Sequence, residues 1–431
     1  METSASALSD APAAALADTR STPSMRWGAD SAWARLALAR SAGAMLVLTL
    51  LKGLITRPHE WAIAHYLLNY SHGFVRRALV GTLLMPLFIG KRGVSIRELI
   101  VGFAFVQITL FGVFAVRALR ELTARPQGGP RYDDVTVACL FASSAFVWNT
   151  SIGLGYFDAL IAVLALIALR HGKLALGTAT PIIIVAMLVH EVAAFICAPL
   201  LALAALSAAP ERPGIDTRRA AQVALAVLGL GALALFIFKA GPSEALKQQM
   251  SSTGAATDEW VNNLYLLMNE TFNGQVEAIF ELKTLGRIYW LESIALLPTP
   301  LLMAALGVMR IWHAPLAPRA RVVWCGLYLV VSFSVLSVCL VAYDFVRMYA
   351  LSALQAFLAY SVVRHKLGND VGESAGSRWV AVVGLGVVIL NLLTPGTFTF
   401  MEPRSRFQPL GYDTWLSDPL RMRELSRILP R

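Results

Sequence analysis

The topology of this chain depends on residues 59–77, HEWAIAHYLLNYSHGFVRR. This stretch follows the first long apolar run and is too polar for hydrocarbon, where ionisable groups are costly. It contains three of the seven histidines of the chain, His59, His65 and His72. One interpretation is an interfacial helix whose aromatic side chains anchor at the lipid headgroups. The other is a substrate-binding loop at the mouth of a cavity within the membrane.

The composition around this stretch indicates a membrane protein. Of 431 residues, 57% are hydrophobic and 15% are charged, whereas a soluble domain carries roughly 25% charged residues. Several continuous apolar runs reach about 17 to 22 residues, the length that crosses about 30 Å of hydrocarbon. We therefore expect an all-α fold, a polytopic bundle of transmembrane helices.

The charged residues and cysteines argue against several other classes. The net charge of +10 does not predict a nucleic-acid partner, because Lys and Arg are spread over short loops, as the positive-inside rule predicts. The four cysteines lie in or beside apolar segments and show neither metal-ligand spacing nor a disulfide framework. No cofactor is predicted, and no motif supports a divalent cation such as Mg²⁺ or Mn²⁺.

The apolar runs predict eleven spans and a cytoplasmic N-terminus. Residues 78–90 are too short for a full span, and we expect a re-entrant or interfacial piece there. If they crossed instead, the arginine-rich loop 117–133 would face outward. Residues 176–208 are read as two spans split near residue 190, the alternative being one long tilted helix. The expected spans are about 36–56, 99–116, 134–149, 156–170, 176–190, 192–208, 221–239, 291–309, 322–342, 346–362 and 379–394.

Three regions follow from these spans. Residues 1–34 are expected to be a disordered cytoplasmic tail, and residues 35–394 the transmembrane domain. Its longer outer loops would lie at about 57–98 and 240–290. Residues 395–431 would form an extracytoplasmic C-terminal tail.

Two carboxylates on the outer side are the catalytic candidates, Glu60 and Asp158. Asp158 begins an apolar helix, where the positive end of the helix dipole favours a carboxylate. A helix-start acid without chemistry is the alternative interpretation. His190 and Glu191 are neighbours within MLVHEVAAFICAPL and are either a binding pair or a polar contact between helices.

Arginines and histidines on the same side are the substrate-binding candidates. Asp344 and Arg347 could pair on one helical face at i and i+3. Arg347 could instead bind phosphate, because its planar fork takes two oxygens at once. The full set is His59, His65, His72, Arg76, Arg77, His190, Glu191, Asp344 and Arg347.

The span number, a first outer loop with interfacial helices and a long later outer loop resemble the GT-C type of membrane glycosyltransferase. They are also similar to bacterial O-antigen and exopolysaccharide polymerases. The pieces SHGFVRRALVG, GYFDALIAVLAL and LVHE look like parts of bacterial membrane proteins encoded with polysaccharide genes. The resemblance implies a polyprenyl-phosphate- or polyprenyl-diphosphate-linked sugar donor, a glycan or lipid acceptor, and the outer face of the bacterial inner membrane.

The sequence departs from that family in one respect. GT-C enzymes commonly carry a catalytic Asp in the first outer loop, and residues 57–98 contain none. Glu60 or Asp158 could take that role, or arginines could do so as in the polymerases. Two other classes stay open: a transporter or flippase for a lipid-linked or anionic solute, and a non-catalytic subunit of an envelope glycan assembly.

Overall fold

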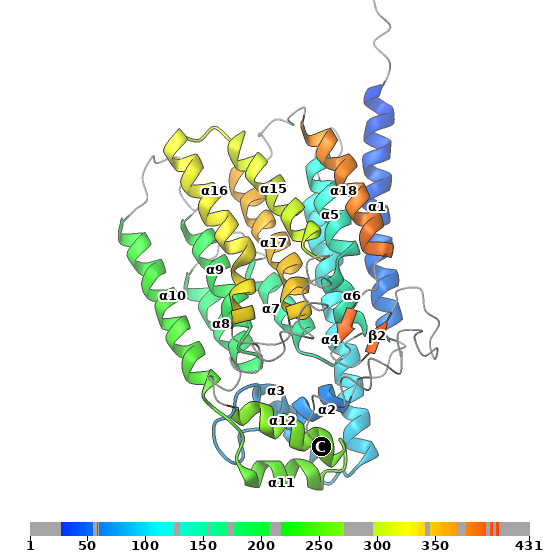
Figure 1. Ribbon diagram of the computed structural model, residues 1–431, viewed down its shortest axis with the longest axis vertical. Coiled ribbons are helices and arrows are strands. Elements are labelled where there is room, and N and C mark those ends of the chain that lie inside the picture. Colours follow the sequence, from blue (N-terminus) through cyan, green and yellow to red (C-terminus); the bar gives the residue numbers. More distant parts are fainter. Residues whose placement is uncertain are drawn as a thin grey trace, which may run out of the picture.

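The protein is an elongated bundle of helices in the computed structural model (Figure 1). The structure describes residues 27–54, 58, 60–124, 130–152, 155–169, 176–206, 217–270, 296–340, 345–368, 376–393, 397–399 and 402–404. Within this part of the chain the strands are one antiparallel hairpin, in which β1 (Thr397–Thr399) pairs with β2 (Glu402–Arg404). The expectation of an all-α membrane protein agrees with this architecture.

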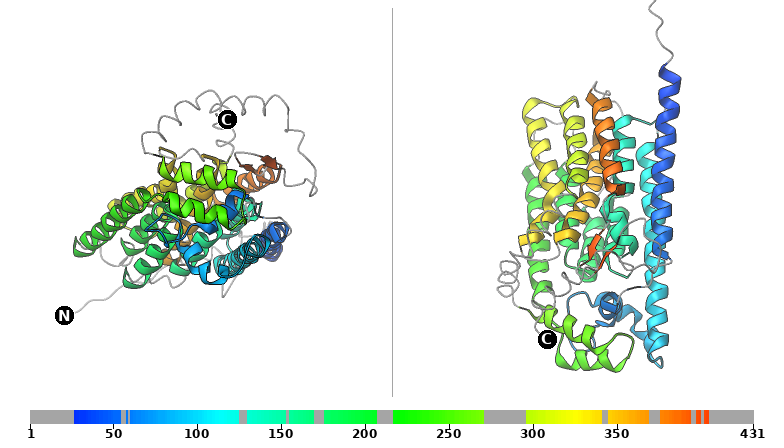
Figure 2. Two further views of the ribbon diagram at one scale, coloured as in Figure 1. Left: turned by 90° about the horizontal axis from the view of Figure 1, so that it is seen from below. Right: turned by 45° about the vertical axis from the view of Figure 1, so that its right-hand side comes forward.

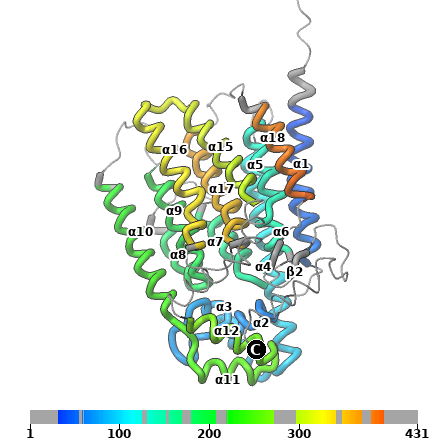
Figure 3. The backbone as a smooth tube through the Cα atoms, in the orientation of Figure 1, coloured from blue at the N-terminus to red at the C-terminus, as the bar shows by residue number. Residues whose placement is uncertain are grey.

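Most of the helices lie side by side along the long axis of the bundle (Figures 1 and 3). They are α1 (Trp27–Leu54), α4 (Val94–Thr123), α5 (Tyr132–Ser143), α6 (Ala145–Ile152), α7 (Asp158–Leu169), α8 (Leu176–Val189), α9 (Ala193–Leu206), α10 (Thr217–Phe238), α15 (Pro298–Trp312), α16 (Pro318–Phe333), the 3₁₀ helix η1 (Ser334–Leu340), α17 (Phe345–Leu367) and α18 (Gly376–Leu393). Within the described part of the chain, four segments are long and apolar enough to cross a membrane: Ala32–Leu54, Val94–Thr123, Ala220–Phe238 and Pro318–Cys339.

Four short helices form a separate layer across one end of the bundle, which we call the cap (Figure 2). They are α2 (Glu60–Leu67), α3 (Leu79–Phe88), α11 (Glu244–Ser252) and α12 (Asp258–Asn269). α2 packs against both α3 and α12, so the cap joins two segments far apart in the sequence. The segment 78–90, for which a short re-entrant or interfacial piece was expected, contributes α3 to this layer.

Gly81 allows α3 to pack closely against the end of α2. A Cβ atom at Gly81 would lie 1.9 Å from the carbonyl oxygen of Leu68 and 2.5 Å from that of Tyr66. Any side chain at this position would therefore push the two cap helices apart.

Several helix bounds differ from those expected from the apolar runs. α1 begins at Trp27, inside the 1–34 stretch that was expected to be disordered, and alanine favours a helix there. The span expected at 134–149 is two helices, because the extended backbone of Ser144 (ψ 154°) interrupts α5 and α6. Residues 176–206 form two helices, α8 and α9, with the chain turning at 190–192.

α17 runs through the middle of the bundle. Its residues from Met348 to Tyr360 are all buried, and it contacts α15, α16, α9 and α6. A helix that is covered on all sides belongs to the core. The polar residues near the two ends of α17 therefore lie inside the bundle, one group near each end.

Candidate functional site

A group of ionisable side chains lies beneath the cap, and we call it the buried ionic network. Its residues come from α2, the connection between α2 and α3, the start of α7, the break between α8 and α9, and the start of α17. Its members are His65, Arg77, Asp158, His190, Glu191 and Arg347. All six were candidates from the sequence.

Arg77 and Glu191 form the first ion pair of the network. Nε of Arg77 lies 3.0 Å from both carboxylate oxygens of Glu191, and Nη2 contacts the same carboxylate. Arg77 has a φ of +63°, the one positive value among the described residues other than glycine. That conformation costs roughly 1 to 2 kcal/mol. Such strain is typical of functional positions.

Arg347 and Asp158 form the second ion pair. Nε of Arg347 donates to Oδ2 of Asp158 at 2.8 Å, and Nη2 donates to Oδ1 at 2.6 Å. This is the two-bond geometry that makes Arg–carboxylate pairs strong. The expected i, i+3 partner of Arg347, Asp344, lies outside the described residues. The pairing that the structure shows joins α17 to α7.

His190 connects the two ion pairs. Its Nε2 lies 3.2 Å from Nη2 of Arg347, and its Nδ1 lies 3.4 Å from Oε2 of Glu191. A guanidinium can only donate, so Nε2 is the acceptor toward Arg347. The backbone N–H of Val192 also donates to Nδ1 of His190, at 3.2 Å, so both ring nitrogens face donors.

His65 extends the network into the cap. Its Nε2 lies 3.2 Å from Nη1 of Arg77, and its Nδ1 lies 2.8 Å from the carbonyl oxygen of Trp61. Nδ1 therefore donates to the carbonyl and Nε2 accepts from Arg77. Burial, helped by the charge of Arg77, lowers the pKa of His65 to about 3. His65 is accordingly an uncharged acceptor at neutral pH.

The network balances its charges and exposes its arginines more than its acids. With both histidines neutral, two guanidinium groups face two carboxylates. The side chains of Arg77 and Arg347 are 14% and 16% exposed, and those of Glu191 and Asp158 are 8% and 11% exposed.

Arg76 points away from the network although it adjoins Arg77. Its Nη2 donates to the carbonyl of Leu267 at 3.0 Å and its Nη1 to that of Phe238 at 3.3 Å. Leu267 lies in the last turn of α12, where a cation satisfies terminal carbonyls. Arg76 therefore fastens the cap to the end of α10.

Glu60 is the first residue of α2 and forms an ion pair with Arg97 through Oε1. Its other oxygen, Oε2, is buried and has no hydrogen-bond partner within the described part of the chain. Glu60 is five residues before His65 on the same helix, a rise of about 7.5 Å. The cap helix that carries His65 of the network therefore also carries a carboxylate oxygen without a partner among the described residues.

The remaining candidates are placed as follows. His72 is exposed, in the connection between α2 and α3. His59 lies outside the described residues, as does the part of the 240–290 loop beyond Glu270. The earlier part of that loop forms α11 and α12 of the cap.

Sequence reasoning missed a second ionic cluster at the opposite end of the bundle. Arg310 is at its centre and contacts Asp133, Asp134 and the hydroxyl of Tyr360 at 3.2, 3.1 and 3.3 Å. The second ionic cluster consists of Arg131, Asp133, Asp134, Arg310, Tyr360 and Arg364. The adjacent acids in YDDVTVA, at the start of an apolar helix, were the available signal.

The described residues contain no group of three or more His, Cys, Asp or Glu side chains arranged to hold a metal ion. Comparisons with known protein families, with curated proteins and with solved structures gave no match. The functional argument therefore rests on the geometry beneath the cap.

Proposed function

We propose that the protein is a membrane glycosyltransferase that uses a polyprenyl-phosphate- or polyprenyl-diphosphate-linked sugar. The reaction would take place beneath the cap, on the outer face of the bacterial inner membrane. One observation carries the proposal: two arginines, each held by a carboxylate, lie beneath the cap, and Oε2 of Glu60 on cap helix α2 has no hydrogen-bond partner in the described part of the chain. A base and cations at the leaving group are what sugar transfer from a phosphate requires.

The proposal includes eleven crossings, made by α1, α4, α5 with α6, α7, α8, α9, α10, α15, α16 with η1, α17 and α18. Contacts between helix ends support this number. The starts of α7 and α17 meet the end of α8 beneath the cap. The start of α5 meets the ends of α15 and α17 at the other end. The second end also carries the basic ends of α4, α15 and α17, which by the positive-inside rule makes it cytoplasmic.

Two features of the cap support the resemblance to GT-C enzymes. The first predicted crossing is followed directly by two short helices, α2 and α3, that lie across the end of the bundle. The later outer loop adds α11 and α12 to the same layer. The cap thus combines the two outer loops on which that resemblance rests.

Glu60 is a better general base than Asp158. Both oxygens of Asp158 accept hydrogen bonds from Arg347, so an acceptor hydroxyl would have to share each oxygen with the guanidinium. Oε2 of Glu60 has no such partner in the described part of the chain. In the proposed step this oxygen takes the proton of the acceptor hydroxyl while the hydroxyl oxygen attacks the anomeric carbon. The bond from that carbon to the phosphate oxygen breaks, and the phosphate leaves with the electron pair.

Arg77 and Arg347 would stabilise the negative charge that develops on the leaving phosphate. Each is held by a carboxylate, which fixes the direction of its remaining N–H groups. Arginine suits this role because its planar donors match phosphate oxygens. The polyprenyl chain would stay in the lipid while the headgroup reacts.

A transporter or flippase for a lipid-linked or anionic solute is the second candidate. The balanced charges of the buried ionic network favour it, because paired groups can exchange partners around a solute without any reaction. The class of non-catalytic envelope subunits has no such observation in its favour.

Purified protein in nanodiscs, given a panel of polyprenyl-linked sugars and the acceptor glycans of the source cell, tests the proposal. We expect Glu60→Gln to bind donor but to form product about 10² to 10⁴ times more slowly. The matched control is Glu98→Gln, since Glu98 is exposed on α4; this change should leave turnover unaltered.

Three outcomes would count against the proposal. Full activity of the Glu60→Gln variant would show that Glu60 is not the general base. Donor binding without any new glycosidic bond, across the whole panel, would favour the transporter. Absence of donor binding would leave only the role of an envelope subunit.

A further inference from the structure

Gln107 of α4 has a buried amide whose hydrogen-bonding capacity is unused within the described part of the chain. The residue is 2% exposed, and neither Nε2 nor Oε1 has a hydrogen-bond partner there. α4 is one of the segments that are long and apolar enough to cross a membrane, where bulk water cannot pair with a buried amide. Because unpaired buried polar groups cost stability and are rare in native proteins, the amide points to a guest that pairs with it.

The hydroxyl of Tyr66 on cap helix α2 approaches the same amide. Tyr66 is fully buried, and its hydroxyl also lacks a hydrogen-bond partner among the described residues. Burial raises the pKa of this hydroxyl, so it stays protonated and can both donate and accept. A direct bond between the two side chains would satisfy one end of the amide and leave the other end unpaired. Tyr66 and Gln107 therefore cannot satisfy each other completely.

Aromatic rings place this pair of polar side chains beside the buried ionic network. The ring centroid of Tyr66 lies 6.0 Å from that of Phe103, one turn before the amide on α4, and 5.0 Å from that of Phe157. The ring of Phe157 lies 6.3 Å from that of His65, a member of the network. Phe157 also immediately precedes Asp158, another member. The two unpaired groups are therefore separated from the network by a single aromatic side chain.

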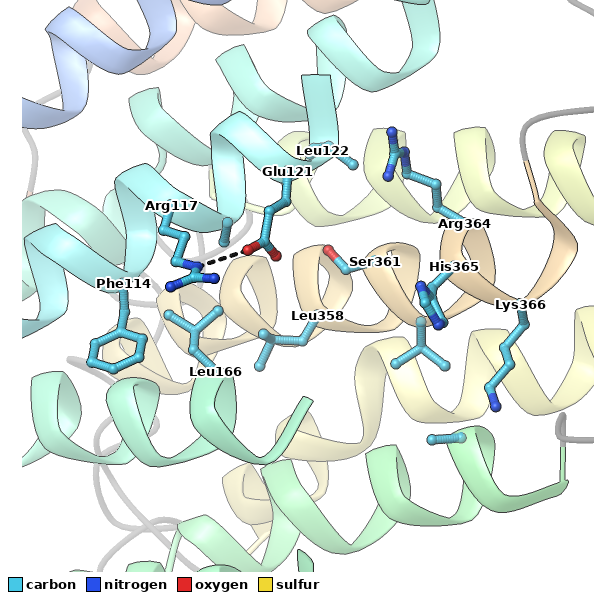
Figure 4. Close-up of a pocket in the computed structure, with 13 residues that line it drawn as sticks. Phe114, Arg117, Glu121, Leu122, Leu166, Leu358, Ser361, Arg364, His365 and Lys366 are labelled. Carbon is cyan, nitrogen blue, oxygen red and sulfur yellow. Dashed lines mark hydrogen bonds and ion pairs between the residues drawn. The ribbon is translucent and has the colours of Figure 1, made fainter. Parts of the chain in front are cut away.

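A groove of about 150 Å³ at the end of the bundle opposite the cap provides a contrast (Figure 4). On its α4 side, Nε of Arg117 donates to Glu121 at 2.8 Å. On its α17 side, the hydroxyl of Ser361 donates to the carbonyl of Phe357 at 2.9 Å, and Arg364 is held by the second ionic cluster. These polar side chains find partners within the fold itself, whereas the buried amide on α4 does not.

We propose that Tyr66 and Gln107 bind a hydroxyl group. Tyr66 would donate to Oε1 of Gln107, Nε2 would donate to the oxygen of the guest, and the guest would donate back to the oxygen of Tyr66. One ring of three hydrogen bonds then pairs all three unpaired atoms. Neither side chain carries a charge, so the site suits an uncharged guest.

Two sources can supply such a hydroxyl group. One is a water molecule that is resident in the free protein, as buried waters commonly pair otherwise unsatisfied polar groups. The other is a hydroxyl of a lipid-linked sugar, which would reach the site only with the ligand. The second source rests on the proposed function, and the first does not.

Thermal unfolding of the purified full-length protein in nanodiscs, with and without a panel of polyprenyl-linked sugars, tests the proposal. The variants are Tyr66→Phe, Gln107→Met and the two combined, which remove polar atoms with little change in volume. If water is the guest, either single change displaces it. Each variant should then unfold at a lower temperature than the wild type, and the double variant should unfold close to the singles.

If the guest is a hydroxyl of the sugar, the sign reverses in the free protein. The double variant then loses unpaired buried groups and should unfold at a higher temperature than the wild type. Each single variant should bind the sugar about fivefold more weakly, the loss of one neutral hydrogen bond. The matched control is Gln222→Met, an exposed position on α10, and it should change neither unfolding nor binding.

Losses of stability that simply add in the double variant would indicate two separate packing defects and would overturn the proposal. So would a double variant that is as stable as the wild type, or more stable, and that binds the sugar with unchanged affinity. A wild type that binds none of the lipid-linked sugars would count against the proposed function. The inference would then stand only if the variants show the lower unfolding temperature that a resident water predicts, and it would fail otherwise.

Discussion

The buried ionic network beneath the cap and the second ionic cluster use the same kinds of side chain but hold them differently. In the cluster, Arg310 is fully buried and contacts two aspartates, a tyrosine hydroxyl and the carbonyl of Gly368. Apart from Tyr360, its members come from helix ends or the residues that adjoin them. In the network, the arginines are partly exposed, and their carboxylate partners lie at the turn between α8 and α9 and at the first residue of α7. The cluster joins helices to one another, and the network is the group to which the proposed function assigns a ligand.

The two groups also differ in backbone strain. Arg77 of the network has a left-handed backbone, whereas no member of the cluster has a positive φ. Strain persists where the surrounding structure compensates for it and where function benefits from it. The contrast supports assigning the chemistry to the network and the stability to the cluster.

The eleven-span proposal places the two groups on opposite faces of the membrane, and reporter fusions test that placement. We expect a reporter near residue 125 to read cytoplasmic and one near residue 265 to read periplasmic. The physical reason is the basic helix ends that surround the cluster. Phosphatase and fluorescent-protein fusions at the two points measure this. An outward signal at 125 would place the arginine-rich end outside and would end the eleven-span proposal.

Removing Arg310 should have the largest effect on stability. Arg310→Met leaves Asp133 and Asp134 buried without their central cation, and breaking a buried charge group in this way costs about 3 to 5 kcal/mol. We expect a large fall in the unfolding temperature of the purified protein. The control is Arg319→Met, because Arg319 is exposed at the start of α16. An unchanged unfolding temperature in Arg310→Met would show that the cluster does not hold the bundle.

Arg347→Lys should show that the network, unlike the cluster, matters more for turnover than for stability. Lys keeps the charge but cannot reproduce the two-bond geometry toward Asp158. We expect the unfolding temperature to change little and turnover with a lipid-linked sugar to fall about 10² to 10³-fold, as when a charge-stabilising donor is lost. Turnover should fall more than donor affinity, since the interaction is made chiefly in the transition state. A fall in stability as large as that of Arg310→Met would show that the network, like the cluster, mainly holds the fold together.

The sequence predicted which residues gather beneath the cap better than it predicted their partners. Periodicity and charge placed Asp158, Glu191 and Arg347 on one side. The sequence suggested a local partner for Arg347, Asp344, which lies outside the described residues. Within them the structure pairs Arg347 with Asp158, 189 positions away, and the sequence did not suggest that pair. Such a pairing depends on how α7 and α17 pack, which a single sequence does not encode locally.

Arg76 and Arg77 show that a single sequence also fails to predict the partners of adjacent residues. Both were expected to bind an anion, and they are neighbours in the sequence. The left-handed backbone at Arg77 sends the two side chains to different partners, Arg76 to carbonyls of α10 and α12 and Arg77 to Glu191. Nothing in the residue types predicts that conformation, because arginine seldom adopts it.

The smallest expected effect concerns the pH dependence of the network, through His65. Its pKa is about 3 in the folded protein and 6.5 in an unfolded chain. The unfolded state therefore binds the proton at a higher pH than the folded state. The stabilising contribution is complete above pH 6.5 and is lost as the pH falls toward 3. Between pH 7 and pH 5 the loss amounts to ~2 kcal/mol.

Unfolding in mixed micelles at pH 7 and pH 5 measures this loss. His65→Gln cannot take up the proton, so its stability should fall by ~2 kcal/mol less than that of the wild type over the same interval. His72→Gln is the matched control, because His72 is exposed, and it should retain the wild-type pH dependence. His190, which also faces Arg347 and Glu191, is present in all three proteins, so its contribution cancels in the comparison. If His65→Gln and the wild type lose equal stability, then His65 is not held as a neutral acceptor by Arg77. The network would then end at Arg77 and would not include a residue of the cap helices.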